Sequence, residues 1–354
     1  MNQAAPRPVL LFLACVTGLV AVMLAVLSAG GFAVLSVFGA LWNGSFGSWY
    51  SITSATLVRS IPLMLTGGAV AVAFRAGVFN IGAEGQLLAG AAAATAVALA
   101  LPQGGMATAA LALGLGALAG SAWAGIAALL RVRFGVLEVI STIMLNFVAL
   151  HLVSFLVRGP LQEPTHAYPQ TATIAAAVRL PSVPGAGRLH AGIALALVAL
   201  GFGGWLLRRT AYGFRLLAVG ENRNAAASAG MIDVERTILG AFLYSGALAG
   251  LAGAAEVLGV TFALYENISP GYGYTAIAVA LLAGLDPWRV VLSAILFGAL
   301  EAGGGAMQRD AGVPATLVSV IEALLILGVL GMQAIQWHDR KNAVPQEEVR
   351  GVVS

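Results

Sequence analysis

The chain has 354 residues, of which 59% are hydrophobic and only 9% are charged, and its mean hydropathy is +0.91. A soluble domain carries about 25% charged residues, so these few charges could not cover a water-soluble fold of this length, and the composition indicates an integral membrane protein. The net charge of +3 comes from basic residues scattered singly between apolar runs, which argues against nucleic-acid binding.

Charge-poor apolar runs divide the chain into predicted membrane-spanning helices. A helix needs about 20 apolar residues to cross the hydrocarbon layer, and the runs allow about ten such helices. Their length and their lack of period-two alternation exclude a transmembrane β-barrel. The predicted spans are 9–36, 49–74, 81–101, 107–130, 136–157, 190–207, 237–260, 272–285, 289–308 and 314–335.

The basic residues predict that both termini face the cytoplasm. With ten helices and the N-terminus inside, 13 of the 18 basic residues lie on the cytoplasmic side, as the positive-inside rule requires. We therefore expect one transmembrane domain over 1–354. It has a proline-rich external loop at 158–188, a long cytoplasmic loop at 208–236 and a cytoplasmic tail at 336–354.

The cytoplasmic loop 208–236 contains the signals of a short capped helix. Asn222 or Asn224 can accept the first free N–H groups of a helix over 225–229, and Gly230 can end that helix in the left-handed conformation. A capped helix projecting between two spans is typical of a docking element.

The sequence lacks the motifs of common catalytic and metal sites. It has no HExxH, no GxSxG and no Walker lysine motif, and Cys15 is its only cysteine. Pairs of glycines four residues apart, Gly116 with Gly120 and Gly246 with Gly250, instead favour close packing between helices. We expect no catalytic residue and no metal site.

The most informative stretch is RAGVFNIGAEGQ at 75–86. Its glycines and polar residues suit a helix that is broken inside the protein and exposes polar groups to an internal cavity. The alternative is a cytoplasmic turn in which Glu84 pairs with Arg75 at the membrane surface. Spacing alone leaves both interpretations open.

A second glycine-rich element, SPGYGYT, lies at 269–275 and precedes another short apolar segment. Two interrupted segments in the two halves of a chain suggest an inverted repeat around a central pathway. Tyr272 and Tyr274 could stack on a planar ligand or could anchor the chain at the membrane interface.

Several polar side chains are predicted to lie inside the membrane. Glu138, Ser141, Thr142 and Asn146 fall on one stripe of the fifth span. Acids also occur within or near other spans, and each either joins helices by hydrogen bonds or lines a transport pathway. These acids are Glu256, Glu301 and Glu322.

Four strings of the sequence resemble the permease subunits of bacterial ABC importers, within the branched-chain amino acid and sugar permease superfamily and its nucleoside-importer branch. The resemblance extends from about 51 to 330. The strings are FRAGVFNIGAEGQ at 74–86, FGVLEVISTIMLNF at 134–147, VRGPLQEP at 157–164 and GFRLLAVGENRNAAASAGM at 213–231.

The resemblance implies a multi-pass protein of the inner membrane that moves nucleosides by alternating access. It implies a second permease subunit in a heterodimer, separate ATPase subunits and an external substrate-binding lipoprotein, with membrane lipid around the spans. No cofactor is expected in this chain, because ATP and Mg would be bound by the ATPase subunits.

The resemblance also assigns candidate residues. The expected substrate pathway consists of Phe79, Asn80, Glu84, Gln86 and Asn146. The expected contact with the ATPase, the coupling helix, consists of Gly220, Asn222, Asn224, Ala226 and Gly230. The alternatives are a simple-sugar ABC permease and, from another class, an ion-coupled transporter that uses Glu301 and Glu322 to carry protons.

Overall fold

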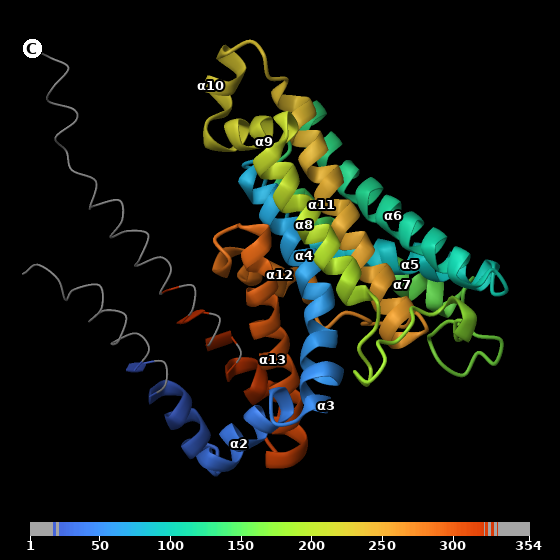
Figure 1. The fold of residues 1–354 in the computed structure, drawn as a ribbon, viewed down its shortest axis with the longest axis vertical. Coiled ribbons are helices and arrows are strands. Elements are labelled where there is room, and N and C mark those ends of the chain that lie inside the picture. Colours follow the sequence, from blue (N-terminus) through green and yellow to red (C-terminus); the bar gives the residue numbers. More distant parts are fainter. Residues whose placement is uncertain (1–16, 19–20, 322, 325–326, 329–330, 332–354) are drawn as a thin grey trace, which may run out of the picture. The chain divides into compact units, whose positions relative to one another are not determined.

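The computed structural model describes residues 17–18, 21–321, 323–324, 327–328 and 331 (Figure 1). The predicted tail 336–354, Glu322 and parts of the first and last predicted spans lie outside the described residues. The chain falls into two compact units, Ser45–Ala299 and a second unit formed by Met1–Gly44 with Leu300–Ser354.

Seven helical runs among the described residues are long and apolar enough to cross a membrane, and a bent helix pair is an eighth candidate. Each of the seven agrees with a predicted span to within about four residues, which confirms the all-helical membrane class. The runs are Trp49–Arg75 (α3, η1 and α4), Ala83–Ala100 (α5), Gly105–Phe134 (α6), Glu138–Arg158 (α7), Gly192–Arg209 (α8), Val234–Thr261 (α11 and η3) and Pro287–Ala311 (α13).

Two predicted spans are not single membrane-crossing helices in the structure. The described part of 9–36 is a helix over Ala21–Ala29 that is followed, at an angle of 112°, by α2 (Val34–Ser45). Two glycines stand at this break, and Gly31 has a φ of +76°, which ordinary residues adopt only with strain. The span predicted at 272–285 is the 11-residue helix α12 (Tyr272–Leu282), which is too short to cross a bilayer.

The loop predicted at 208–236 contains two helices instead of one. The first, α9 (Ala211–Glu221), is capped by the Thr210 hydroxyl, which accepts a hydrogen bond from the Gly213 N–H. The second, α10 (Arg223–Ser228), is the short helix expected from the sequence. Both lie at one end of the bundle, near the ends of α6 and α11 (Figure 1).

The centre of the larger unit is α11, which packs against α4, α5 and α6. Its contact with α6 is made through glycines, as the sequence predicted. A Cβ atom on Gly120 would lie 2.6 Å from the Cα of Gly250, and one on Gly246 would overlap the Gly120 carbonyl. The two backbones therefore approach as closely as glycine allows.

Candidate functional site

The segment between α4 and α5, residues 76–82, belongs to the larger unit, and its alternate residues are buried. Ala76, Val78 and Asn80 are fully buried, and Gly77 has a φ of +67° that breaks the helix. The Arg75 guanidinium donates to the carbonyls of Gly284 and Leu285 at 3.3 and 3.2 Å, away from Glu84. The Glu84–Arg75 pair of the surface-turn alternative is therefore not formed, and the chain is broken between α4 and α5 by a segment whose polar residues face the interior of the unit.

Asn80 and Gln86 hold each other across the break. The Asn80 amide donates to Gln86 at 3.0 Å and to the Ser245 hydroxyl on α11 at 2.9 Å. Its Oδ1 accepts from the Gln86 amide and from the Gly82 N–H, both at 2.9 Å. With every donor and two acceptor positions used, this pair fastens the first turn of α5 to α11.

Glu84 contacts the second glycine-rich element, at 269–275. The Gly273 N–H donates to Glu84 Oε2 at 2.7 Å, and the Ser269 hydroxyl also hydrogen-bonds this carboxylate. Ser269 Oγ additionally accepts from the N–H groups of Gly271 and Tyr272 at the start of α12, each at 3.1 Å. The two interrupted segments, separated by almost 190 residues, thus meet at Glu84.

A pocket of about 310 Å³ opens beside this contact. Within it, the Asn146 amide accepts from the Gly85 N–H at 2.8 Å and donates to the Ile81 carbonyl at 3.0 Å and to the Tyr274 hydroxyl at 3.3 Å. The pocket is lined by Glu84, Leu88, Asn146, Phe147, Leu150, Ser269, Pro270, Gly271 and Tyr274.

The pocket combines a hydrogen-bond acceptor, a donor and aromatic surface. Glu84 supplies a carboxylate. The Tyr274 hydroxyl accepts from Asn146, and its own proton has no acceptor among the described residues, so a ligand can receive it. The rings of Tyr274 and Phe147 are partly exposed. Such a pocket suits a small polar molecule that has a planar ring.

The structure separates the five predicted pathway residues into three groups. Glu84 and Asn146 line the pocket, whereas Asn80 and Gln86 form the buried pair behind it. Phe79 is 53% exposed outside the pocket, with its ring edge-on to Phe74 at a centroid distance of 5.3 Å.

The apolar lining of the pocket was not predicted from the sequence. Leu150 stands one helical turn after Asn146, so extending the polar stripe of α7 would have included it. Ser269 and Pro270 were noticed only as part of a helix break, because a capping serine gives no sign in the sequence of the partner it faces across the fold.

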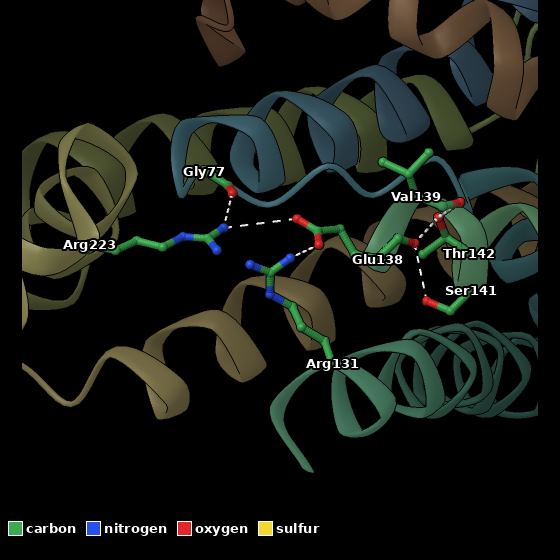
Figure 2. A network of polar contacts seen from close by, with 7 residues as sticks. All are labelled: Gly77, Arg131, Glu138, Val139, Ser141, Thr142 and Arg223. Carbon is green, nitrogen blue, oxygen red and sulfur yellow. Dashed lines mark hydrogen bonds and ion pairs between the residues drawn. The ribbon is translucent and has the colours of Figure 1, made fainter. Parts of the chain in front are cut away.

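A second polar network lies where α6, α7 and α10 approach each other (Figure 2). Arg131 at the end of α6 forms an ion pair with Oε2 of Glu138, and Arg223 of α10 lies 3.9 Å from Oε1 of the same carboxylate. Arg223 also donates to the Gly77 carbonyl, which belongs to the broken segment.

Glu138 begins the predicted stripe of α7. Glu138, Ser141, Thr142 and Asn146 are all buried, which confirms the stripe. The hydroxyls of Ser141 and Thr142 donate to the Glu138 carbonyl at 3.1 and 2.7 Å (Figure 2). The side chain of Glu138 is held by arginines, which the sequence did not identify as its partners.

The five residues predicted for the coupling helix have different surroundings. Asn222, and not Asn224, caps α10 by accepting from the Ala225 N–H at 3.0 Å. Ala226 is buried, and Asn224 is exposed. Gly230 has a φ of +72° just after the helix, in agreement with its predicted conformation.

Gly220, near the end of α9, lies directly against the broken segment. A Cβ atom on it would overlap the Arg75 carbonyl and would lie 3.1 Å from the Gly77 nitrogen. The predicted coupling region therefore contacts the chain that leads to Glu84.

Neither Glu256 nor Glu301 is among the residues that line the pocket. Glu256 is buried near the end of α11, and Glu301 belongs to α13. Across the described part of the chain, no three His, Cys, Asp or Glu side chains are grouped as metal ligands.

Residues 52–330 match the family described as the permease component of the branched-chain amino acid transport system. The chain is 40% identical over 329 residues to the guanosine ABC transporter permease protein NupP of Bacillus subtilis, covering 92% of this chain and 93% of that protein. It is 38% identical over 353 residues to the glucose ABC transporter permease protein TsgB13 of Haloferax volcanii, covering 93% and 92%.

A third relative is the nucleoside ABC transporter permease protein NupB of Lactococcus lactis. It is 33% identical over 296 residues, covering 81% of this chain and 80% of that protein. No solved structure matches the chain.

Proposed function

Because the chain belongs to the permease family of the branched-chain amino acid transport system, we propose that it forms the membrane pathway of an ABC importer for nucleosides. It is a multi-pass protein of the plasma membrane and a permease subunit, so the chain itself is not an enzyme. Its contribution to transport is to bind the substrate in the membrane and to change which side has access to it.

The observation that carries this proposal is the pocket at Glu84. A volume of about 310 Å³ is at the lower end of small-molecule sites. The Glu84 carboxylate can accept hydrogen bonds from ribose hydroxyls or from base N–H groups, and the Tyr274 hydroxyl can donate one. The exposed face of an aromatic ring can stack on the base. Two of the relatives above are named as guanosine and nucleoside permeases.

The proposed complex contains subunits that this chain does not supply. Separate ATPase subunits would bind ATP and Mg and would contact α10. A second permease, in a heterodimer, and an external binding lipoprotein would complete the pathway. In this arrangement α10 faces the cytoplasm, and the segment 159–191 between α7 and α8 faces outward.

A simple sugar is the second candidate substrate. The relative from Haloferax volcanii is named as a glucose permease and is nearly as similar to this chain as NupP is. A sugar would hydrogen-bond to the carboxylate and the hydroxyl of the pocket, but it would cover less of the pocket's aromatic surface than a nucleoside.

The ion-coupled alternative has no support among the relatives, which are ABC permeases. An affinity tag on this chain in its native membrane should recover an ABC ATPase in stoichiometric amounts. Recovery of the chain without any ATPase would contradict the proposed importer.

The substrate is tested by uptake in cells that lack the gene and in cells that express it from a plasmid. Labelled guanosine, uridine and glucose are supplied separately, and competition by each unlabelled compound is measured. We expect nucleoside uptake that depends on the chain and that excess nucleoside, but not excess glucose, suppresses. Uptake of glucose alone would replace the nucleoside assignment with the sugar one.

A further inference from the structure

Arg223 occupies a helix position where its charge is unfavourable. It is the first residue of α10, and the N-terminus of a helix carries a partial positive charge that disfavours a cation. The guanidinium is turned instead toward the interior of the bundle, where it donates to the Gly77 carbonyl and faces the Glu138 carboxylate at 3.9 Å (Figure 2).

The two groups that Arg223 contacts begin the two segments that lead to the pocket. Gly77 lies seven residues before Glu84 in the broken segment. Glu138 lies eight residues before Asn146 along α7, a rise of about 12 Å along one helix. One guanidinium thus connects α10 to both of the elements that supply the pocket's polar side chains.

Neither of these connections is loose. Val78, Asn80 and Glu84 of the broken segment are buried, and Asn80 fastens this segment to Gln86 and Ser245. Along α7, the polar stripe from Glu138 to Asn146 is buried as well. A displacement of α10 would therefore be transmitted along these two segments to Glu84 and Asn146, since packed interiors transmit strain.

We propose that Arg223 is a positioning residue that couples α10 to the substrate pocket. By holding the Gly77 carbonyl and the Glu138 carboxylate together, it makes Glu84 and Asn146 move in step with the helix. The proposal rests on the proposed function, since α10 is taken to be the element that an ATPase moves.

The ion pair with Arg131 makes this proposal testable without unfolding the protein. Arg131 binds the other oxygen of Glu138, so that carboxylate keeps a partner when Arg223 is replaced. Removing Arg223 also relieves α10 of a charge at its N-terminus. The variant Arg223→Gln is accordingly expected to insert and to assemble normally.

The first experiment measures substrate taken up per ATP hydrolysed by the complete complex in proteoliposomes. Arg223→Gln should lower this ratio by about two- to thirtyfold, the range of measured effects of residues that modulate coupling between sites. Arg236→Gln is the charge-matched control, because Arg236, in the first turn of α11, is 87% exposed and pairs only with Asp233 among the described residues.

The same assay includes two further variants. Arg223→Lys keeps the charge opposite Glu138 and should retain part of the ratio that Arg223→Gln loses. In the double variant Arg223→Gln with Glu138→Gln, the fold-loss of this ratio should be smaller than the product of the fold-losses in the two single variants, because both changes remove the same contact. A ratio unchanged by Arg223→Gln, or effects of the two single variants that multiply, would overturn the proposal.

The second experiment does not depend on the substrate. A fluorescent label is attached at Phe147→Cys, in a Cys15→Ala background, and its spectrum is recorded before and after nucleotide is trapped in the ATPase subunits. The label should respond in the otherwise native chain, and Arg223→Gln should abolish the response. A response that survives Arg223→Gln, or the absence of a response in the otherwise native chain, overturns the coupling role. Because no substrate is added, this result holds whether or not the substrate assignment is correct.

Discussion

The backbone N–H of Gly273 donates a 2.7 Å hydrogen bond to Oε2 of Glu84. This bond joins two glycine-rich segments that lie 189 residues apart in the sequence of the larger unit. The contact is possible because the residue is glycine. A Cβ atom there would lie 2.7 Å from the carbonyl carbon of Ala83 and would overlap the backbone of Glu84 itself. The backbone of one broken segment thus rests directly on the backbone of the other, at the wall of the pocket.

The variant Gly273→Ala should therefore displace α12 from α5. Overpacking of this kind costs about 1–3 kcal/mol, so we expect a lower melting temperature in detergent and a loss of uptake. Gly114→Ala is the matched control, because no atom lies within 4 Å of the Cβ position at that glycine in α6. Equal behaviour of the two variants would show that the contact at Glu84 is not tight.

The variants Asn80→Ala and Glu84→Gln should have different effects. Asn80→Ala leaves the buried amide of Gln86 and the Gly82 N–H without their partner, at about 1–3 kcal/mol for each unsatisfied group. It should lower thermal stability and the yield of assembled complex. A pathway residue, the role expected for Asn80 from the sequence, would instead slow uptake when replaced and leave assembly intact. The closed hydrogen bonding of Asn80 favours the loss of stability.

Glu84→Gln keeps one oxygen that can accept from Gly273, and it replaces the other carboxylate oxygen with an amide NH2 group, which removes the charge and one acceptor. Assembly should stay normal, whereas nucleoside uptake should fall by about one to two decades if a substrate hydrogen bond of 1–3 kcal/mol is lost. Uptake and melting temperature are measured on the same preparations. A Glu84→Gln protein that fails to assemble would assign this carboxylate to structure instead of transport.

The sequence predicts the helices of this fold well because the composition of each segment by itself determines whether it forms a membrane helix. An apolar run of 20 residues has few alternatives in a membrane. The four-residue spacing of Gly116 with Gly120 and of Gly246 with Gly250 predicts close packing between helices, and the structure shows that α6 and α11 pack on each other there. Caps are equally local: Gly230 could be found from its neighbours alone, and the N-cap could be narrowed to Asn222 or Asn224, of which the structure uses Asn222.

The partners of the polar side chains could not be predicted in the same way. Glu84 is bound by Gly273 and Ser269, and Glu138 by Arg131 and Arg223, through contacts that depend on the packing of whole helices. For Arg223 the sequence offered one usable sign, a positive charge placed at a helix N-terminus. The same charge at the end of a helix would have needed no partner.

The predicted orientation of the chain is tested by labelling single cysteines. Ser182, in the segment before α8, and Ser228, in α10, are both exposed. Each is changed to cysteine in a Cys15→Ala background and treated with a membrane-impermeant thiol reagent on intact cells. We expect labelling at 182 only, with both sites labelled after the cells are opened. Labelling at 228 from outside would reverse the orientation based on the basic residues.

The end of α10 should depend on Gly230. Its φ of +72° disfavours a β-branched residue, and no atom lies within 4 Å of its Cβ position, so Gly230→Val tests conformation without a clash. The strain of about 1–3 kcal/mol should weaken association with the ATPase while membrane levels stay normal. Gly230→Asn is the control, since asparagine tolerates the left-handed region. If both variants retain association, Gly230 has no role in docking.

Stability should also fall as the pH is lowered through the range in which His190 titrates. This side chain precedes α8, its Nδ1 accepts from the Gly192 N–H at 3.2 Å, and its Nε2 is buried with no hydrogen-bond partner in the described structure. Burial disfavours the charged form and lowers the pKa of His190 from its usual 6.5 to about 4.

Between these two pH values the unfolded chain binds a proton that the folded chain does not. The free energy of unfolding is therefore highest above pH 6.5 and decreases toward pH 4, with a loss from this residue of about 2 kcal/mol between pH 7.5 and pH 5. His190→Asn keeps an acceptor for Gly192 but does not titrate, so its melting temperature should fall less over the same range. Melting temperatures that fall in parallel with pH for the native chain and for His190→Asn would contradict the prediction. They would show that the pKa of His190 does not differ between the folded and the unfolded chain.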